Sequence, residues 1–449
     1  MSGQITNDKH QHTHKNGGFH SSLGFVLACV GSAVGMGNIW MFPYRVGQYG
    51  GAAFLIPYLI FVAIFGTVGL SAEFAIGRRA GTGTLGAYKY CWESRKKGKI
   101  GAAIGWIPLL GSLGIAIGYS VIVGWVVRSL WSALSGQMMN VEATEFFAAM
   151  KEDFSSVPWH VIVVVIAVLI LMFGATSGIE KVNKFMMPAF FILFAFVAIR
   201  VAFLPDAIEG YKFLFVPRWE YLLKADTWIM AMGQAFFSLS ITGSGMIVYG
   251  TYLKKSENIP GASVRTAVFD TLAAMLSALA IMPAVFSFGI EPNSGPPLIF
   301  ITLPTIFQQI PMGRLLAVFF FVSVVFAGIT SLINMFEAVS ESWQHKFHLP
   351  RKLAVSLCGA ITFVVGLFLE AEPKVGQWMD FITILVVPFG ALLGAISIYF
   401  VLGYKEIRKE MEEGRPNPMP RWFGFVAKYV YVPLAVIVFI LGIVKGGIG

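Results

Sequence analysis

The chain has 449 residues, of which 56% are hydrophobic and only 13% are charged. A soluble protein carries about a quarter charged residues, so this composition excludes an ordinary soluble domain. A net charge of +9 would suggest nucleic-acid binding in a soluble protein, but here the basic residues stand between long apolar blocks. The positive-inside rule of membrane proteins accounts for that placement. We therefore expect a polytopic helical membrane protein with the lipid bilayer, and no nucleic acid, as its surroundings.

Eleven apolar blocks follow a polar N-terminal stretch. Most of them reach the roughly 20 residues that a spanning helix needs. The blocks cover residues 22–48, 52–77, 103–135, 158–175, 185–204, 227–253, 264–289, 313–343, 352–370, 377–403 and 424–445. We predict a cytoplasmic N-terminal tail over 1–20, five helices over 21–204 and five more over 227–403. A cytoplasmic loop and an eleventh helix are expected over 404–449.

The charges between the blocks predict the topology. Basic residues gather in the second, sixth and tenth connections, at Arg78, Arg79, Lys89, Arg95, Lys96, Lys97 and Lys99, at Lys254, Lys255 and Arg265, and at Lys405, Arg408, Lys409, Arg415 and Arg421. The third connection carries acidic residues instead, at Glu142, Glu145, Glu152 and Asp153. Because positive charges mark the cytoplasmic side, we expect a plasma (inner) membrane protein with its N-terminus inside and its C-terminus outside.

Two blocks are interrupted by residues that disfavour a continuous helix. The first contains GSAVGMGNIWMFPY (31–44), where glycines and Pro43 stand beside the amide of Asn38. The sixth contains FFSLSITGSGMIVYGTY (236–252), with glycines and hydroxyl side chains at its middle. If ten helices form two repeats of five, blocks one and six are equivalent and the second repeat is inverted. Glycine and proline can also merely kink packed helices, but matching breaks favour a binding site.

Unwinding a helix inside lipid frees backbone groups that need new partners. Freed carbonyl oxygens, together with a hydroxyl or an amide oxygen, suit a hard and singly charged cation. The amides that begin the next half-helix favour an anionic group such as a carboxylate. The residues alone therefore predict a cation-coupled transporter of a small solute with an anionic end.

The run GSAVGMGNIWMFPY…GGAAFLIPY resembles the first-helix signature of the neurotransmitter:sodium symporter family. EFAIGR, GIEKVNKFMMP, GQAFFSLS and FAGITS resemble later blocks of the family and occur in the family's order. Eleven spans are typical of its bacterial amino-acid transporters. The resemblance implies an all-α polytopic membrane protein with a leucine-transporter-like fold, in which two five-helix repeats are inverted and helices 1 and 6 are unwound. It implies a transporter and not an enzyme.

The resemblance also implies two sodium sites and no organic cofactor. The first would use the Ala33 carbonyl and the side chains of Asn38, Ser238 and Asp270. The second would use the carbonyls of Gly31, Val34 and Ala327 and the hydroxyls of Thr330 and Ser331. Each site has a simpler alternative. Asp270 of the first site could be an interfacial residue near Arg265, and the Thr330 and Ser331 hydroxyls of the second could be bonded back to their own helix. A fixed carboxylate at Asp270 would replace the chloride that some relatives need, so we expect chloride-independent transport.

By the same resemblance, the substrate is a neutral amino acid. Its pocket would be lined by Ala33, Gly35, Met36, Gly37, Ile115, Tyr119, Phe237, Ser240, Gly243, Ser331 and Met335. Gly243 stands where relatives usually carry a bulky side chain, which hints at a bulky aliphatic or aromatic substrate. The expected function is sodium-coupled import of that amino acid by alternating access. The alternative is a membrane sensor that binds an amino acid without transporting it.

The sequence departs from the family pattern at both gates. Met41 stands where the family has an arginine, so Arg45, one helical turn further on, is predicted to pair with Asp380 as a displaced outer gate. Arg45 could equally anchor the helix at the interface. At the inner side, Phe19 replaces a tryptophan and Lys15 is only approximately placed, so the inner gate is left unassigned.

Overall fold

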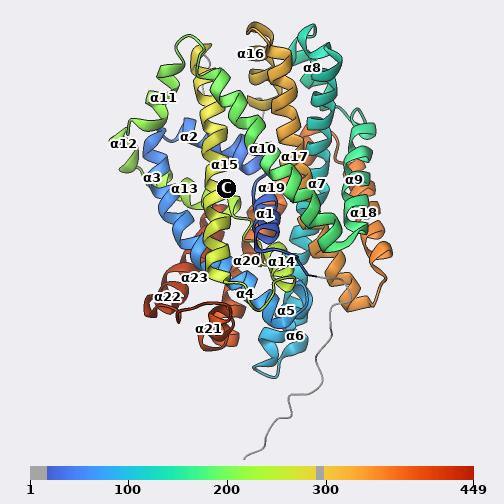
Figure 1. The fold of residues 1–449 in the computed structure, drawn as a ribbon, viewed down its shortest axis with the longest axis vertical. Coiled ribbons are helices and arrows are strands. Elements are labelled where there is room, and N and C mark those ends of the chain that lie inside the picture. Colours follow the sequence, from blue (N-terminus) through green and yellow to red (C-terminus); the bar gives the residue numbers. More distant parts are fainter. Residues whose placement is uncertain (1–17, 290–297, 449) are drawn as a thin grey trace, which may run out of the picture.

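A computed structural model of the chain describes residues 18–289 and 298–448 (Figure 1). Every regular element within these two ranges is a helix. Residues 1–17, which make up most of the predicted cytoplasmic tail and include Lys15, lie outside the described residues.

Two helices of the first half begin at local sequence signals. The Ser21 side chain accepts a hydrogen bond from the Gly24 N–H at 3.0 Å and caps the first helix. Pro43 stands in the first turn of α2, where its missing N–H costs nothing. The main elements of this half are α1 (Ser22–Ala33), a π-helical turn (Gly37–Met41), α2 (Phe42–Gln48), α3 (Ala52–Ile64), α4 (Leu70–Ala80), α7 (Trp106–Ser135), α9 (Val157–Met172) and α10 (Lys181–Val201).

The second half repeats the pattern of a broken first helix followed by long ones. The Asn258 side chain caps α15 by accepting from the Gly261 N–H at 3.1 Å. The elements are α13 (Ala225–Ser238), α14 (Gly245–Thr251), α15 (Ile259–Ser287), α17 (Gly313–Phe347), α18 (Arg351–Leu367), α19 (Glu372–Asp380) and α20 (Val387–Ile396), and α23 (Val432–Lys445) follows them.

The connecting helices gather at the two ends of the bundle. Figure 1 shows α8 (Ala143–Met150), α11 (Ala207–Phe215) and α16 (Leu303–Gln309) at one end, and α5 (Thr84–Glu93), α6 (Gly98–Ile104), α21 (Tyr404–Glu412) and α22 (Arg421–Val426) at the other. The short helix α12 (Trp219–Leu222) follows α11. The acidic third connection and the basic second and tenth connections therefore lie at opposite ends of the molecule.

The described helices vary in their capacity to span a membrane. Seven are long and apolar enough to do so, or eight when the bent pair Ser22–Ala33 and Gly37–Gln48 is counted as one span. α9 is a shorter apolar helix, and α13 and α14 are two short halves of one block. The count of eleven spans therefore stays a prediction, although each predicted block contains at least one helix.

Glycines allow α4 and α14 to approach closely in the core. A Cβ on Gly250 of α14 would lie 2.5 Å from the Phe74 carbonyl oxygen of α4, and a Cβ on Gly77 would lie 3.1 Å from the Gly250 Cα. Small residues permit such backbone contact between membrane helices. The contact fixes α14, the second half of the broken sixth block, against α4.

Candidate ion and substrate sites

The first break separates α1 from the π-helical turn that leads into α2, and the two parts are bent by 60°. The Gly35 N–H donates to the Asn38 Oδ1 at 3.1 Å instead of continuing the α1 ladder. Asn38 is fully buried, so its side chain replaces a backbone partner that lipid could not supply. Asn38 thus stabilises the break in which it lies.

The second break lies between α13 and α14. Ser240 and Gly243 both have positive φ, at +52° and +74°. This conformation disfavours most side chains, and Gly243 adopts it without steric cost. The Gly243 N–H donates to the buried Glu73 carboxylate at 2.8 Å, and the Ser240 hydroxyl donates to the Ser32 carbonyl at 3.1 Å. The second contact joins the two breaks directly.

Side chains from three helices meet at the candidate first cation site. The Asn38 Nδ2 donates to Asp270 Oδ1 at 2.8 Å and to Ser238 Oγ at 3.1 Å. The Ser238 hydroxyl donates to Asp270 Oδ2 at 2.7 Å. All three residues are buried, and Asp270 is fully so, which favours a role inside the helix bundle over one at its surface. The Ser238 hydroxyl and the Asp270 carboxylate supply oxygens that fit a hard cation, whereas Asn38 turns its Nδ2 toward them and its Oδ1 toward the Gly35 N–H. Ala33 is buried at the end of α1.

The candidate second cation site lies between α1 and α17. The Ser331 hydroxyl lies 3.2 Å from the Gly31 carbonyl oxygen and 3.0 Å from that of Val34, and donates toward both. One O–H cannot satisfy several carbonyls at once, so lone pairs of these oxygens are free to bind a cation. The Thr330 hydroxyl instead donates to the Ala327 carbonyl of its own helix at 3.1 Å. The simpler alternative therefore holds for Thr330, whereas Ser331 reaches α1.

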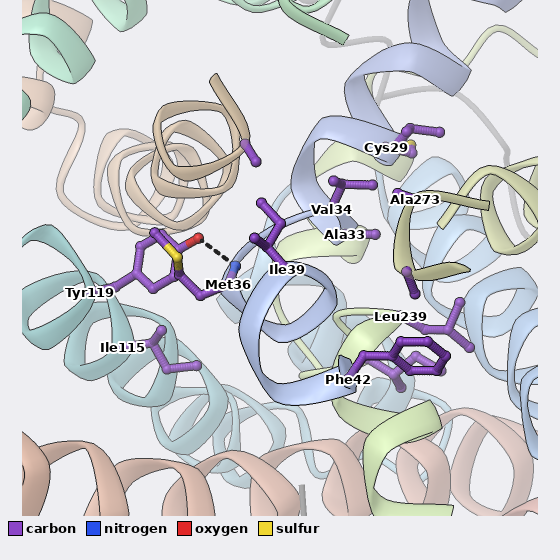
Figure 2. Close-up of a cluster of buried hydrophobic side chains, with 14 of the residues drawn as sticks. Cys29, Ala33, Val34, Met36, Ile39, Phe42, Ile115, Tyr119, Leu239 and Ala273 are labelled. Carbon is purple, nitrogen blue, oxygen red and sulfur yellow. Dashed lines mark hydrogen bonds between the residues drawn. The ribbon is translucent and has the colours of Figure 1, made fainter. Parts of the chain in front are cut away.

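A cavity of about 90 Å³ lies beside the first break. The Met36 N–H donates to the Tyr119 hydroxyl across it at 3.3 Å (Figure 2). A Cβ on Gly35 would lie 2.7 Å from the Tyr119 hydroxyl and 2.9 Å from Ser331 Oγ, so only glycine leaves this corner open. The cavity is lined by ten of the residues expected at the pocket: Ala33, Gly35, Met36, Gly37, Ile115, Tyr119, Phe237, Ser240, Ser331 and Met335.

Gly243 is the exception, and its predicted role was wrong. It is not among the residues that line the cavity. A Cβ there would lie 2.6 Å from the Tyr88 hydroxyl and 2.7 Å from the Gly390 carbonyl oxygen, so the position points into packed protein. Gly243 therefore does not widen the pocket. A glycine at this position instead permits the positive φ of the second break.

The cavity also has lining residues that the sequence did not indicate. Ser112, Asn334 and Thr383 add polar groups to it, and Ile448 packs against it from the far end of the chain. Polar residues inside apolar blocks were a usable signal for the first three. Ile448 carries no such signal, because its position depends on how α23 packs beside α20.

The predicted outer gate is not formed in this arrangement. Among the described residues no ion pair joins Arg45 to Asp380. The Arg45 guanidinium lies 5.5 Å from the centre of the Tyr44 ring, and its Nε has no hydrogen-bond partner. Asp380 is exposed to solvent. In this arrangement Asp380 is exposed and Arg45 packs on Tyr44, so the predicted pair is absent.

A buried polar network that the sequence did not assign lies between the ends of α14, α17 and α18. Arg351 donates to both Glu337 carboxylate oxygens, at 2.9 and 2.7 Å, and Tyr252 donates to Glu337 as well. Phe19 covers Tyr252 edge to face, with the ring centres 6.0 Å apart. A carboxylate inside an apolar span was the available signal, because such a residue needs a partner.

Comparisons with known proteins agree with this architecture. The model of the Sodium:neurotransmitter symporter family matches residues 16–151 and 140–446. The uncharacterized sodium-dependent transporter YhdH of Bacillus subtilis is 33% identical, over 94% of this chain and 97% of its own length. An uncharacterized sodium-dependent transporter of Haemophilus influenzae is 31% identical, over 96% of this chain and 98% of its own. The crystal structure of MhsT in complex with L-phenylalanine superposes with a TM-score of 0.85 at 30% identity, covering 95% of this chain and 99% of MhsT.

An all-helical bundle with two broken helices around a buried polar centre defines a membrane transporter rather than an enzyme. The chain belongs to the Sodium:neurotransmitter symporter family. The family assignment and the all-helical, leucine-transporter-like fold, both implied by the resemblance of the motif blocks, are confirmed, and the division into two inverted five-helix repeats stays a prediction. The chain is therefore a multi-pass, sodium-dependent membrane transporter.

Proposed function

We propose that the protein imports a neutral amino acid together with sodium by alternating access. The observation that carries this proposal is the hydrogen bond from the Met36 N–H to the Tyr119 hydroxyl. Met36 lies two residues before Asn38 in the chain. Amides that begin a half-helix favour an anionic group, and the oxygens around Asn38 favour a cation. One break can therefore bind a substrate carboxylate and a sodium ion side by side.

The side chain of the substrate would occupy the apolar part of the cavity. Ile115, Phe237 and Met335 line it, and no Lys, Arg, Asp or Glu is among the described residues that do so. Such a lining favours a neutral, bulky aliphatic or aromatic side chain. MhsT, a structural relative, has been crystallised with L-phenylalanine, which supports this class of substrate.

Two sodium ions are proposed, one at each candidate site. Ala33, Asn38, Ser238 and Asp270 would hold the first, and Gly31, Val34, Ala327, Thr330 and Ser331 would hold the second. Bound sodium would be coordinated by the oxygens of the first break and would draw that break toward α15 and α17. Binding would then bias the equilibrium between outward-open and inward-open states, as coupled transport requires.

Transport is proposed to be independent of chloride, because Asp270 carries a fixed negative charge beside the first site. Its two carboxylate oxygens accept from Asn38 and Ser238 at 2.8 and 2.7 Å. A bound anion would add a second negative charge to a buried position, which is costly. Equal sodium-driven uptake in chloride and gluconate media is the expected result.

The membrane orientation follows the charges at the two ends of the bundle. The end that carries α5, α6 and α21 is basic, so we propose that it faces the cytoplasm, with the N-terminus inside and the C-terminus outside. The plasma (inner) membrane is the proposed location. Cysteine labelling from outside of variants with a cysteine on α8 or on α21 tests this: only the α8 variant should react.

The proposal is tested with purified protein in two steps. Melting temperatures are measured for the twenty amino acids in sodium chloride and in choline chloride, because a ligand that binds only the folded state raises the melting temperature. Stabilisation by aliphatic or aromatic amino acids that requires sodium is expected. Counterflow in proteoliposomes then separates a symporter from the alternative, a sensor that binds without transport. Binding without counterflow would establish the sensor.

A further inference from the structure

Asn183 of α10 presents a buried oxygen that has no partner. Its side chain is fully buried, and its Nδ2 donates to the Ile179 carbonyl at 2.8 Å. That bond places the Nδ2 toward the Ile179 carbonyl and so turns the Oδ1 to the opposite side. The Oδ1 is left pointing away from its own helix, without a hydrogen-bond partner among the described residues.

This oxygen lies beside Gly31 and Thr330, two of the residues proposed for the second cation site. A Cβ on Gly31 would collide with the Asn183 Oδ1, and the same point lies 3.1 Å from the Asn183 Cγ and 3.0 Å from the Thr330 Cβ. Gly31 contributes one of the proposed carbonyl ligands, and Thr330 contributes a hydroxyl. The α10 helix packs against both α1 and α17, so the Asn183 side chain lies near the interface between α1 and α17, where these ligands are found.

A buried amide oxygen without a partner costs free energy unless something binds it. The contact with Gly31 supplies only a weak C–H donor. A side-chain amide oxygen has the same chemistry as the backbone carbonyls of Gly31 and Val34, and it carries no net charge. It can therefore extend an oxygen shell that suits a singly charged cation without attracting a divalent one.

We propose that the Asn183 Oδ1 is a further ligand of the sodium ion at the second site. This inference rests on the proposed function, because it assumes that sodium binds between α1 and α17. It brings a third helix, α10, into that site. Loss of sodium would then free α10 as well as the end of α1.

The test uses sodium alone, without an amino acid. The melting temperature of the purified full-length protein is followed as sodium chloride replaces choline chloride at constant ionic strength. Asn183→Leu removes the oxygen with little change in size, and Asn183→Ala serves if the leucine variant does not fold. The sodium concentration for half-maximal stabilisation should rise about tenfold, which corresponds to about 1.4 kcal/mol.

Controls separate a ligand from a packing residue. Thr362→Val, on α18, removes another fully buried oxygen without a hydrogen-bond partner and should leave the sodium titration unchanged. Asn183→Leu combined with Ser331→Ala should be non-additive, because both act on one ion, whereas its combination with Ser238→Ala should be additive. The conservative variant Asn183→Asp keeps an oxygen and should retain sodium binding.

The outcomes are distinguishable. If the wild-type protein gains no stability from sodium, the proposed function itself fails. If the wild type responds and Asn183→Leu shows the same half-saturating sodium concentration, only the role of Asn183 is refuted, and the residue serves to pack against Gly31. Additive effects of Asn183→Leu and Ser331→Ala would refute it equally.

Discussion

The two candidate cation sites share one helix break, but they are built from different kinds of oxygen. The first contains a carboxylate, and its side chains already bond to each other: Asn38, Ser238 and Asp270 form a closed set of contacts between 2.7 and 3.1 Å. The second is neutral and relies on backbone carbonyls that converge on Ser331. A charged and preformed site should depend steeply on one residue, whereas a neutral site should lose affinity in small steps as each ligand is removed.

Removal of the carboxylate should have the largest effect. Asp270→Ala leaves the Asn38 amide and the Ser238 hydroxyl without their buried acceptor, and hydrogen bonds to charged groups contribute about 1.5–3 kcal/mol each. Sodium-driven uptake into proteoliposomes should fall by about a hundredfold or more. Asp270→Asn keeps the size but not the charge, and its residual uptake should become stimulated by chloride. The exposed Asp226→Asn is the matched control, and chloride-insensitive, wild-type uptake by Asp270→Asn would contradict the prediction.

Filling the corner beside the first break should come next. A Cβ in Gly35→Ala would press on the Tyr119 and Ser331 hydroxyls at 2.7 and 2.9 Å. Overpacking of this kind costs about 1–3 kcal/mol. Amino-acid affinity, measured by scintillation proximity at saturating sodium, should fall by at least tenfold. Gly376→Ala is the control, because a Cβ there meets nothing within 4 Å. Unchanged affinity in Gly35→Ala would show that the substrate does not bind beside Gly35.

The two hydroxyls of the second site should differ from each other. Ser331→Ala removes the group that reaches the α1 carbonyls, and we expect the half-saturating sodium concentration to rise about fivefold, close to 1 kcal/mol. Thr330→Val should raise it less, because the Thr330 hydroxyl already donates to Ala327 on its own helix. Isothermal titration with sodium measures both variants. A larger effect at Thr330 would show that the contact along its own helix is given up when the ion binds.

The smallest effect is expected at the outer side. Arg45 and Asp380 form no ion pair among the described contacts, so Arg45→Gln and Asp380→Asn should each change uptake by less than twofold. Their effects should add to within about 0.5 kcal/mol in the double variant. A larger coupling energy would restore the predicted outer gate in another conformation of the transport cycle.

The motif blocks predicted the family and the fold, because each reflects a local requirement. Glycines at 35 and 37 and the amide of Asn38 mark a helix that must break and cap itself inside a bilayer, and both features lie within eight residues of sequence. The pocket residues on α7 and α17 were predicted from the resemblance to the family, and Ile115 and Met335 each stand four residues from Tyr119 and Ser331, on the same face of their helix. The roles of these residues in transport stay predictions.

The positions that the sequence misjudged or left unassigned depend on partners far along the chain. Gly243 was expected at the pocket, but its neighbours are Tyr88 and Gly390, whose approach no local pattern reveals. Arg351 and Tyr252 meet Glu337 only because α14, α17 and α18 end at one place.

The sequence by itself determined a polytopic helical protein with two matching helix breaks, since hydrophobic length and helix-breaking residues act through local backbone physics. Only the tertiary structure decided which hydroxyl crosses to α1 and which bonds to its own helix, and only it placed the unpartnered oxygen of Asn183 against Gly31. These choices depend on how helices that are distant in sequence rotate and approach each other. A buried polar atom is satisfied by whatever that packing brings within reach, so the pairing cannot be read from either residue alone.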